Sequence, residues 1–252
     1  MMIEAALFDG DQTLWDFERV MRDALIAVLD ELRVARPGPS TRSLRWEDLE
    51  RDRTEVGIEL EGVEYNLARL RVLGFARTLE RLRGADGGVG VKSANDATLT
   101  EELAASYFAH RDRDPALFPD TLPCLEALRP HYRLGLLSNG SRLPEKVGLG
   151  HFFETVVFAQ DHRVAKPDKG IFEIVERELG VEPGACVLVG DHPINDVAGA
   201  KRAGWAAIWI DREGDGTFSP LGDVDDELDG KPDAAVRSLN ELPTAIEGLD
   251  RR

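Results

Sequence analysis

The chain has 252 residues, of which 42% are hydrophobic and 31% are charged, which is the composition of a globular protein with room for one large domain or two smaller ones. The formal net charge of −16 argues against nucleic acid and anionic membranes as partners, and no apolar run is long enough to span a bilayer. The N-terminal MMIEAALFDG lacks the basic residues of a signal peptide, so we expect a cytoplasmic protein. A monomer or homodimer is the default expectation for its oligomeric state.

Short apolar runs recur along the chain, and a helical pattern follows each of them. Because the apolar residues are consecutive, as in RLGLL and CVLVG, they predict strands buried on both faces of a parallel sheet. Strands that alternate with amphipathic helices are typical of a doubly wound α/β domain. The expected strands are 3–8, 133–137, 155–159, 186–190, 206–210 and 234–236, and the expected helices are 121–129, 168–179, 195–203 and 238–246. Gly180 and Gly204 are expected as helix C-caps.

A long interval between the first two strands interrupts this alternation, and no loop of a compact domain is that long without structure of its own. Helical patterns recur within it, at 17–32, 62–82 and 97–109. The apolar face of the first pattern is formed by Leu25, Val28, Leu29 and Leu32. The interval therefore predicts a helical domain at 16–112, inserted into an α/β core made of residues 1–15 and 113–252.

Several stretches carry expectations about the surface and the interior. We interpret GADGGVG at 84–90 as a flexible break in the helical domain, and the acidic, glycine-rich 213–232 as a surface loop. A solvated helix face is expected for Arg69, Arg71, Arg77 and Arg81. Cys124 and Cys186 lie in apolar surroundings, which favours buried, reduced thiols.

Polar and charged residues follow four of the expected strands. They are Asp9-Gly10-Asp11-Gln12-Thr13, Ser138-Asn139-Gly140, Lys166-Pro167-Asp168 and the GDHPIND stretch from Gly190 to Asp196. Open α/β sheets bind ligands beyond the carboxyl ends of their strands, so we expect these four segments to meet at one edge of the sheet.

Each segment offers a distinct chemistry. The carboxylates of Asp9 and Asp191 provide the hard oxygen ligands that Mg²⁺ prefers, and the metal would make the crowded acids tolerable. Asp9 and Asp11 point the same way from an extended chain, so one acid can attack while the other transfers protons. The hydroxyl of Ser138 and the amides that follow it suit phosphate oxygens, and Lys166 offsets negative charge.

The segments FDGDQTL, LLSNG, KPD and GDHPIND resemble the four motifs of the haloacid dehalogenase (HAD) superfamily, in the family's order and over residues 3 to about 211. The insertion resembles the helical cap of the family's C1 subgroup. The resemblance implies a Rossmann-like core and a Mg²⁺-dependent hydrolase. Gly10 and Gln12 depart mildly from the commonest form of the first motif without removing a needed functional group.

The resemblance also implies a role for each matching residue. Asp9 would be the nucleophile that forms an aspartyl-phosphate. Asp11 would protonate the leaving oxygen and then deprotonate the attacking water, and its carbonyl would contact Mg²⁺. The remaining roles are phosphate binding for Ser138, Asn139 and Lys166, metal binding for Asp191, ligand or support for Asp196, and support for Thr13.

Four functions remain open at this point. The first is a phosphatase that hydrolyses a small phosphorylated metabolite. The second is a haloacid dehalogenase, against which Asp11 argues, because a halide leaves without a proton. The third is a phosphomutase, and the fourth is an inactive relative that only binds a ligand. Core packing is the default interpretation for Trp15, and His192 is expected at the rim of the site.

Overall fold

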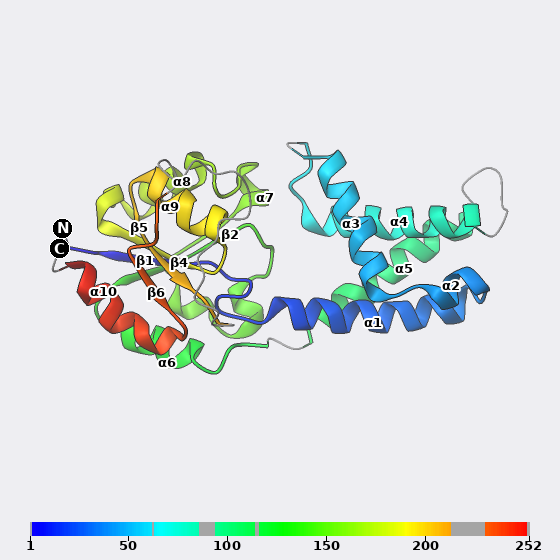
Figure 1. Cartoon of the computed structure of the whole chain (residues 1–252), viewed down its shortest axis with the longest axis horizontal. Coiled ribbons are helices and arrows are strands. Elements are labelled where there is room, and N and C mark those ends of the chain that lie inside the picture. The colour runs from blue at the N-terminus through cyan, green and yellow to red at the C-terminus, as the bar shows by residue number, and fades with distance from the viewer. Residues whose placement is uncertain (1, 62, 86–93, 114–115, 213–229, 251–252) are drawn as a thin grey trace. The chain divides into compact units, whose positions relative to one another are not determined.

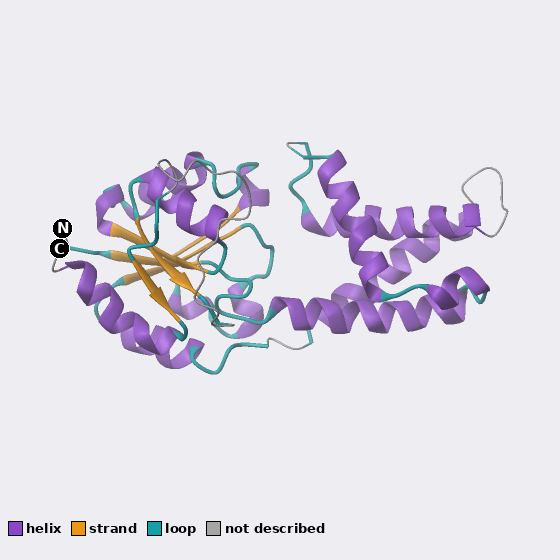
Figure 2. Cartoon of the chain, viewed as in Figure 1, coloured by secondary structure: helices purple, strands orange, loops and turns teal. Residues whose placement is uncertain are grey.

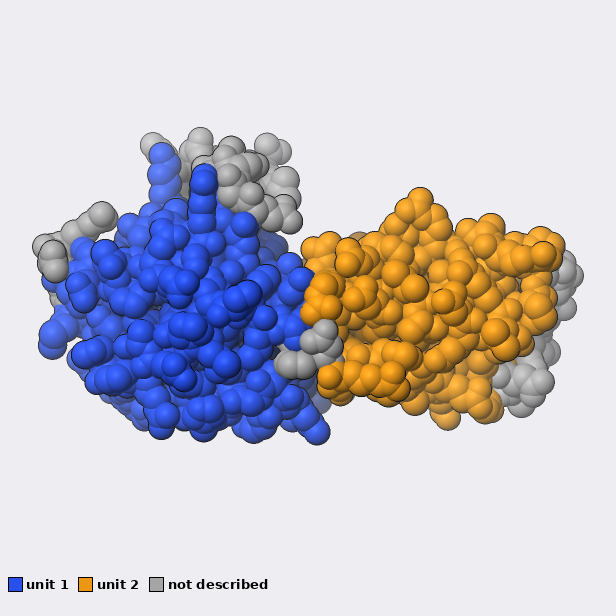
Figure 3. Space-filling view, turned by 90° about the horizontal axis from the view of Figure 1, so that it is seen from below, with its two compact units in different colours: residues 1–16, 116–252 blue, residues 17–115 orange. Residues whose placement is uncertain are grey.

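The computed structural model describes residues 2–61, 63–85, 94–113, 116–212 and 230–250. The chain divides into two compact units, which Figure 3 shows in different colours. Unit 1 comprises Met1–Asp16 with Ala116–Arg252, and unit 2 comprises Phe17–Pro115.

Unit 1 contains a parallel sheet with the strand order β3-β2-β1-β4-β5-β6 (Figure 1). Its strands are β1 (Ala5–Phe8), β2 (Arg133–Ser138), β3 (Thr155–Phe158), β4 (Cys186–Gly190), β5 (Ala206–Ile210) and β6 (Ala234–Val236). The predicted parallel α/β fold is confirmed, and β1 and β4 are buried along their whole lengths, as their consecutive apolar residues require. The chain progresses from β1 to β3 on one side and continues with β4 on the other, so the switch point of the sheet lies between β1 and β4.

Helices cover both faces of this sheet (Figure 2). On one face, α8 (Lys169–Leu179) packs against α9 (Gly199–Ala203), and on the other α6 (Thr121–Leu128) packs against α10 (Leu242–Asp250). Shorter helical segments in the described part of unit 1 are α7 (Ala159–His162), the 3-10 turns Pro144–Val147, Gly150–Phe152, Pro183–Ala185 and Leu239–Glu241, and the π-helical turn Pro193–Ala198.

The ends of these helices show how closely local sequence determines them. Gly180 and Gly204 adopt left-handed φ values of 62° and 85° after α8 and α9, which confirms both C-caps. The helix expected from Asn195 begins earlier, because Nδ1 of His192 accepts hydrogen bonds from the amides of Ile194 and Asn195, both at 3.2 Å. His192 is thus an exposed capping residue of the π-helical turn.

Unit 2 is entirely helical in its described part. Its helices are α1 (Phe17–Ala35), α2 (Pro39–Ser43), α3 (Trp46–Glu59), α4 (Leu67–Ala85) and α5 (Ala94–Arg111). The apolar face predicted on α1 is buried and packs with Leu49 of α3, Phe75 of α4 and Leu103 of α5. The pattern expected from residue 62 begins as a helix only at Leu67. Helix α3 was not predicted, because its sequence, WEDLERDRTEVGIE, is mostly polar. Only Leu49, Asp52 and Val56 of this helix are buried.

The expectation of a solvated arginine face is wrong for Arg71. This residue is 5% exposed, its Nη2 donates to Oε2 of Glu50 at 2.7 Å, and its guanidinium carbon lies 4.6 Å from the ring centroid of Tyr107. The carboxylate and the ring come from α3 and α5, so the sequence around Arg71 contains no sign that it is buried.

The remaining expectations have simple outcomes. Residues 86–90 of the expected flexible break and residues 213–229 of the expected surface loop lie outside the described residues, and residues 84–85 of the break belong to α4. Cys124 and Cys186 are buried and free, as predicted, and burial raises the pKa of each thiol to about 12. Among the described helices, none combines the length and the hydropathy needed to cross a bilayer.

Candidate active site

The carboxyl ends of the strands bring the predicted segments together. Asp9 follows β1, and its amide continues the ladder by donating to the carbonyl of Val189 in β4 at 2.9 Å. Ser138 is the last residue of β2, and Asp191 directly follows β4. Because β1 lies between β2 and β4, these three positions share one edge of the sheet, at its switch point.

Lys166 lies at the centre of this edge and is 3% exposed. Its ammonium group donates to Oδ1 of Asp9 at 2.7 Å, to Oδ1 of Asp196 at 2.6 Å and to the carbonyl of Leu137 at 2.8 Å. Burial alone would lower the pKa of Lys166, but the carboxylates of Asp196 and Asp9 raise it above its ordinary value. The lysine is therefore a permanent positive charge in contact with the proposed nucleophile.

The side chain of Asn139 binds the backbone of Lys166. Its side-chain amide donates to the carbonyl of Lys166 at 2.9 Å, and its Oδ1 accepts the Lys166 amide at 2.8 Å. Asn139 was expected to bind phosphate, and the structure places both polar ends of its side chain on Lys166 instead. A contact from Asn139 to phosphate would therefore come from its backbone amide.

The carboxylates of Asp9, Asp191 and Asp196 each offer an oxygen within 4.8 Å of the others. Burial is the main cause that raises the pKa of Asp9 well above its usual value, opposed by Lys166 and increased by the neighbouring carboxylates. Burial, followed by the charge of Asp196, raises the pKa of Asp191 to about 7. One ammonium does not balance three carboxylates, so a divalent cation fits this donor set.

Gly190 allows Asp196 to reach this group. A Cβ atom at Gly190 would lie 2.3 Å from Cγ of Asp196, so any larger residue would displace that carboxylate. Oδ2 of Asp196 accepts the amide of His192 at 2.9 Å, which ties it to the turn after β4. Asp196 is 2% exposed and contacts Lys166, so it supports the lysine whether or not it also binds a metal.

The segment after β1 folds back on itself. The carboxylate of Asp11 lies outside the group of three acids and accepts the indole N–H of Trp15 at 2.6 Å. Thr13 is fully buried, and its hydroxyl donates to Oδ1 of Asp191 at 3.4 Å. Gln12 adopts a positive φ of 61°, which makes the tight turn that returns the chain towards Asp11.

The turn after β2 lies beside Asp11. The amide of Gly140 donates to the hydroxyl of Ser138 at 2.9 Å. A Cβ atom at Gly140 would lie 2.6 Å from Oδ2 of Asp11 and 3.0 Å from that hydroxyl. The carboxyl group of Asp11 and the proposed phosphate-binding hydroxyl therefore face the same small space.

Three contacts of this site were not predicted from the sequence. Trp15 is buried, as the core-packing interpretation expected, and its N–H also donates to Asp11. Trp209 of β5 donates its indole N–H to the carbonyl of Asp191 at 2.8 Å, and Arg212 donates to the carbonyl of Thr13 at 2.6 Å. Trp209 and Arg212 are far along the chain from these partners, so no local pattern identifies them.

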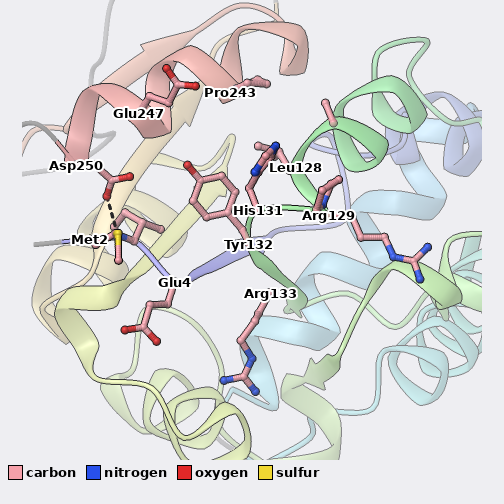
Figure 4. A pocket seen from close by; sticks show the side chains of 13 residues that line it. Met2, Glu4, Leu128, Arg129, His131, Tyr132, Arg133, Pro243, Glu247 and Asp250 are labelled. Atoms are coloured by element: carbon pink, nitrogen blue, oxygen red, sulfur yellow. Dashed lines mark hydrogen bonds between the residues drawn. The ribbon is translucent and has the colours of Figure 1, made fainter.

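A cavity of about 570 Å³ lies in a different part of unit 1, and Figure 4 shows the side chains that line it. Met2 and Glu4 precede β1 in the chain, Arg133 opens β2, and Asp250 ends α10 and accepts the amide of Ile3 at 2.6 Å. This cavity lies at the amino ends of the strands, opposite to Asp9, and so is separate from the candidate active site.

Comparison with known proteins identifies the family of this site. The model of the haloacid dehalogenase-like hydrolases matches residues 3–204, which include all four motifs. The chain belongs to the haloacid dehalogenase-like hydrolase family. This match confirms the resemblance to the superfamily that the four motifs predicted, and the fold class with it.

The relatives of this hydrolase include phosphatases and a dehalogenase. A 5-amino-6-(5-phospho-D-ribitylamino)uracil phosphatase of Escherichia coli is 31% identical over 212 residues, which cover 82% of this chain and 83% of the relative. A glyceraldehyde 3-phosphate phosphatase of Methanopyrus kandleri is 31% identical and covers 98% and 99%. The crystal structure of a 2-haloacid dehalogenase from Pseudomonas syringae superimposes with a TM-score of 0.75 and 29% identity, covering 98% of this chain and 99% of that one.

Proposed function

We propose that this hydrolase is a Mg²⁺-dependent phosphatase that hydrolyses a small phosphorylated metabolite through an aspartyl-phosphate on Asp9. The observation that carries the proposal is the group formed by Asp9, Asp191 and Asp196, in which Lys166 is bonded to Asp9 and Asp196. The phosphatase names of two relatives with high coverage support it.

The metal would be held by Asp9, Asp191 and the carbonyl of Asp11, with Asp196 as a further ligand or as support. When bound, Mg²⁺ would neutralise negative charge on the oxygens of the phosphoryl group that is transferred. The ammonium of Lys166 contributes a second, permanent positive charge beside Asp9, at 2.7 Å from its Oδ1.

The protein residues would carry out two displacements. In the first, a carboxylate oxygen of Asp9 attacks phosphorus, the ester P–O bond breaks, and Asp11 gives a proton to the leaving oxygen. In the second, Asp11 takes a proton from water as the water attacks phosphorus, and the bond to Asp9 breaks to release inorganic phosphate. Ser138 would hold phosphoryl oxygens in both steps, and residues 16–112 would form the cap that selects the substrate.

A dehalogenase is the second candidate, because the Pseudomonas dehalogenase shares the fold over nearly the whole chain. That reaction uses a carboxylate nucleophile but needs neither a proton for the halide nor a divalent cation. Three clustered carboxylates, together with Asp11 facing the turn at Ser138, favour the phosphatase.

The deciding experiment is a panel of phosphomonoesters and 2-haloacids, each assayed with Mg²⁺ and with EDTA. We expect phosphate release from at least one phosphomonoester, lost in EDTA and restored by Mg²⁺. Asp9→Asn serves as the blank, because it removes the nucleophile. Halide release that persists in EDTA, without phosphatase activity, would replace this proposal with the dehalogenase.

A further inference from the structure

Trp15 is a buried residue whose indole N–H contacts a residue of the candidate active site. Trp15 is only 1% exposed, and its indole N–H donates to Oδ1 of Asp11 at 2.6 Å. Both residues lie in the segment directly after β1, four positions apart. A buried indole N–H usually finds a hydrogen-bond partner, and here that partner is the carboxyl group of Asp11, so the contact also restrains the proposed acid.

The surrounding backbone holds the indole in this place. A Cβ atom at Gly10 would lie 2.4 Å from Cζ2 of Trp15, so the ring occupies the space that a side chain at Gly10 would need. The amide of Gln12 donates to the carbonyl of Trp15 at 2.8 Å, across the turn formed by the positive φ of Gln12. Trp15 also pairs with Leu117 through a β-bridge. The glycine at position 10 thus makes room for the ring that contacts Asp11.

The contact restrains the orientation of the Asp11 carboxyl group. With Oδ1 bonded to Trp15, Oδ2 faces the turn after β2, where a Cβ atom at Gly140 would come within 2.6 Å of it. The same built atom would lie 3.0 Å from the hydroxyl of Ser138. One oxygen of Asp11 is therefore held by Trp15 while the other faces the expected phosphate-binding group.

We propose that Trp15 is a positioning residue that orients the carboxyl group of Asp11 for proton transfer to the leaving oxygen. This inference rests on the proposed phosphatase function. The proposed role predicts different losses of activity for two classes of substrate. An alkyl phosphomonoester needs a proton on its leaving oxygen, whereas p-nitrophenyl phosphate releases a stable phenolate without one.

The test compares kcat/KM for these two substrates, since kcat/KM reports the step in which the leaving group departs. The alkyl substrate used is the alkyl phosphomonoester that the wild type hydrolyses fastest in the panel. Trp15→Phe should lower its kcat/KM by about tenfold or more, part of the roughly 10²–10⁴-fold that a positioned acid contributes. The value for p-nitrophenyl phosphate should fall by less than about threefold.

One further variant isolates the N–H group, a double variant tests its link to Asp11, and a third variant is the control. Replacement of Trp15 by 3-benzothienylalanine keeps the bicyclic shape and removes only the donor, so it should reproduce the selective loss even if Trp15→Phe folds poorly. In an Asp11→Asn background, Trp15→Phe should no longer change the ratio of the two kcat/KM values. Trp205→Phe is the matched control, because Trp205 is also 1% exposed and donates its N–H to Glu176 at 2.8 Å.

The outcomes are distinguishable. Equal losses on both substrates, or a selective loss that persists with Asp11→Asn, would overturn the role of Trp15 and leave the phosphatase intact. A wild type that hydrolyses no phosphomonoester would overturn the proposed function, and this inference with it. Selective loss in both Trp15 variants, absent from Trp205→Phe, is the expected result.

Discussion

The ammonium group of Lys166 lies between two carboxylates that would otherwise repel each other, at 2.7 Å from Asp9 and 2.6 Å from Asp196. Burial still raises the pKa of Asp9, so the protein keeps its proposed nucleophile in a place where its charged form is disfavoured. Such an arrangement contributes to reactivity at the expense of stability, which is common at active sites. The effects of a substitution on activity and on folding should therefore diverge at Asp9.

Asp9→Asn tests this divergence. We expect the variant to lose phosphatase activity by at least about four powers of ten, since its amide is a poor nucleophile. In EDTA its melting temperature should equal or exceed that of the wild type, because a neutral group replaces a disfavoured buried charge. Activity assays and thermal unfolding measure the two effects. A melting temperature several degrees below the wild type would show that the contact with Lys166 outweighs the burial of the charge.

Single elements show how much of this architecture was predictable. Strands such as CVLVG and caps such as Gly180 were predicted because consecutive apolar residues and left-handed glycines act locally. Helix α3 and the buried Arg71 were not, because their burial depends on partners in other helices. The same distinction holds in the site. The four motifs were predicted to share one edge, whereas the contact between Trp15 and Asp11 depends on how the chain turns after β1.

The end of β4 offers a test at Gly190. The Cβ of Gly190→Ala would overlap the carboxylate of Asp196, which holds Lys166. We expect a loss of about 1–3 kcal/mol in the free energy of unfolding and a fall in kcat of at least about tenfold. Gly248→Ala is the control, since Gly248 lies in α10 and an added Cβ would meet no atom within 4 Å. This substitution should raise the free energy of unfolding by about 0.5–1 kcal/mol. Denaturant titrations that rank both variants alike would refute the predicted overlap.

Asp120 links three elements of unit 1 just before α6. It accepts hydrogen bonds from Arg212 at 3.1 Å, from the hydroxyl of Ser238 at 2.7 Å and from the amide of Leu239 at 2.8 Å. Burial alone would raise the pKa of Asp120, but these donors lower it below its usual value. The stabilisation is therefore present above the ordinary carboxyl pKa and is lost as the pH falls through the lowered value.

Asp120→Asn should accordingly reduce the free energy of unfolding by about 1–3 kcal/mol at pH 7. The difference from the wild type should stay constant down to about pH 5 and shrink below about pH 4. Urea titrations across this range measure it. Glu173→Gln, which removes an exposed ion pair with Lys169, should change stability by less than about 1 kcal/mol. A difference that grows as the pH falls would contradict the assigned sign.

Because the whole molecule is strongly negative, both dissolved salt and a metal bound at this site should stabilise the fold. With a formal net charge of −16, the folded chain repels itself, and any salt should stabilise it by screening. A cation bound at the group of Asp9, Asp191 and Asp196, with Asp9 and Asp191 as ligands, should add a separate effect, of about 2.7 kcal/mol when Mg²⁺ is present at 100 times its dissociation constant. These two contributions differ in their dependence on concentration and on Asp191.

Thermal unfolding in EDTA, in Mg²⁺ and in NaCl of matched ionic strength separates them. We expect Mg²⁺ to raise the melting temperature of the wild type several degrees more than NaCl does, since about 1 kcal/mol corresponds to 2–4 °C for a chain of this size. In Asp191→Asn the extra increase should vanish, while the response to NaCl should remain, because one carboxylate out of 47 acidic residues hardly alters the overall repulsion. If Mg²⁺ and NaCl acted equally on the wild type, the acidic group at the sheet edge would hold no specific cation, and the charge of Lys166 alone would have to balance it.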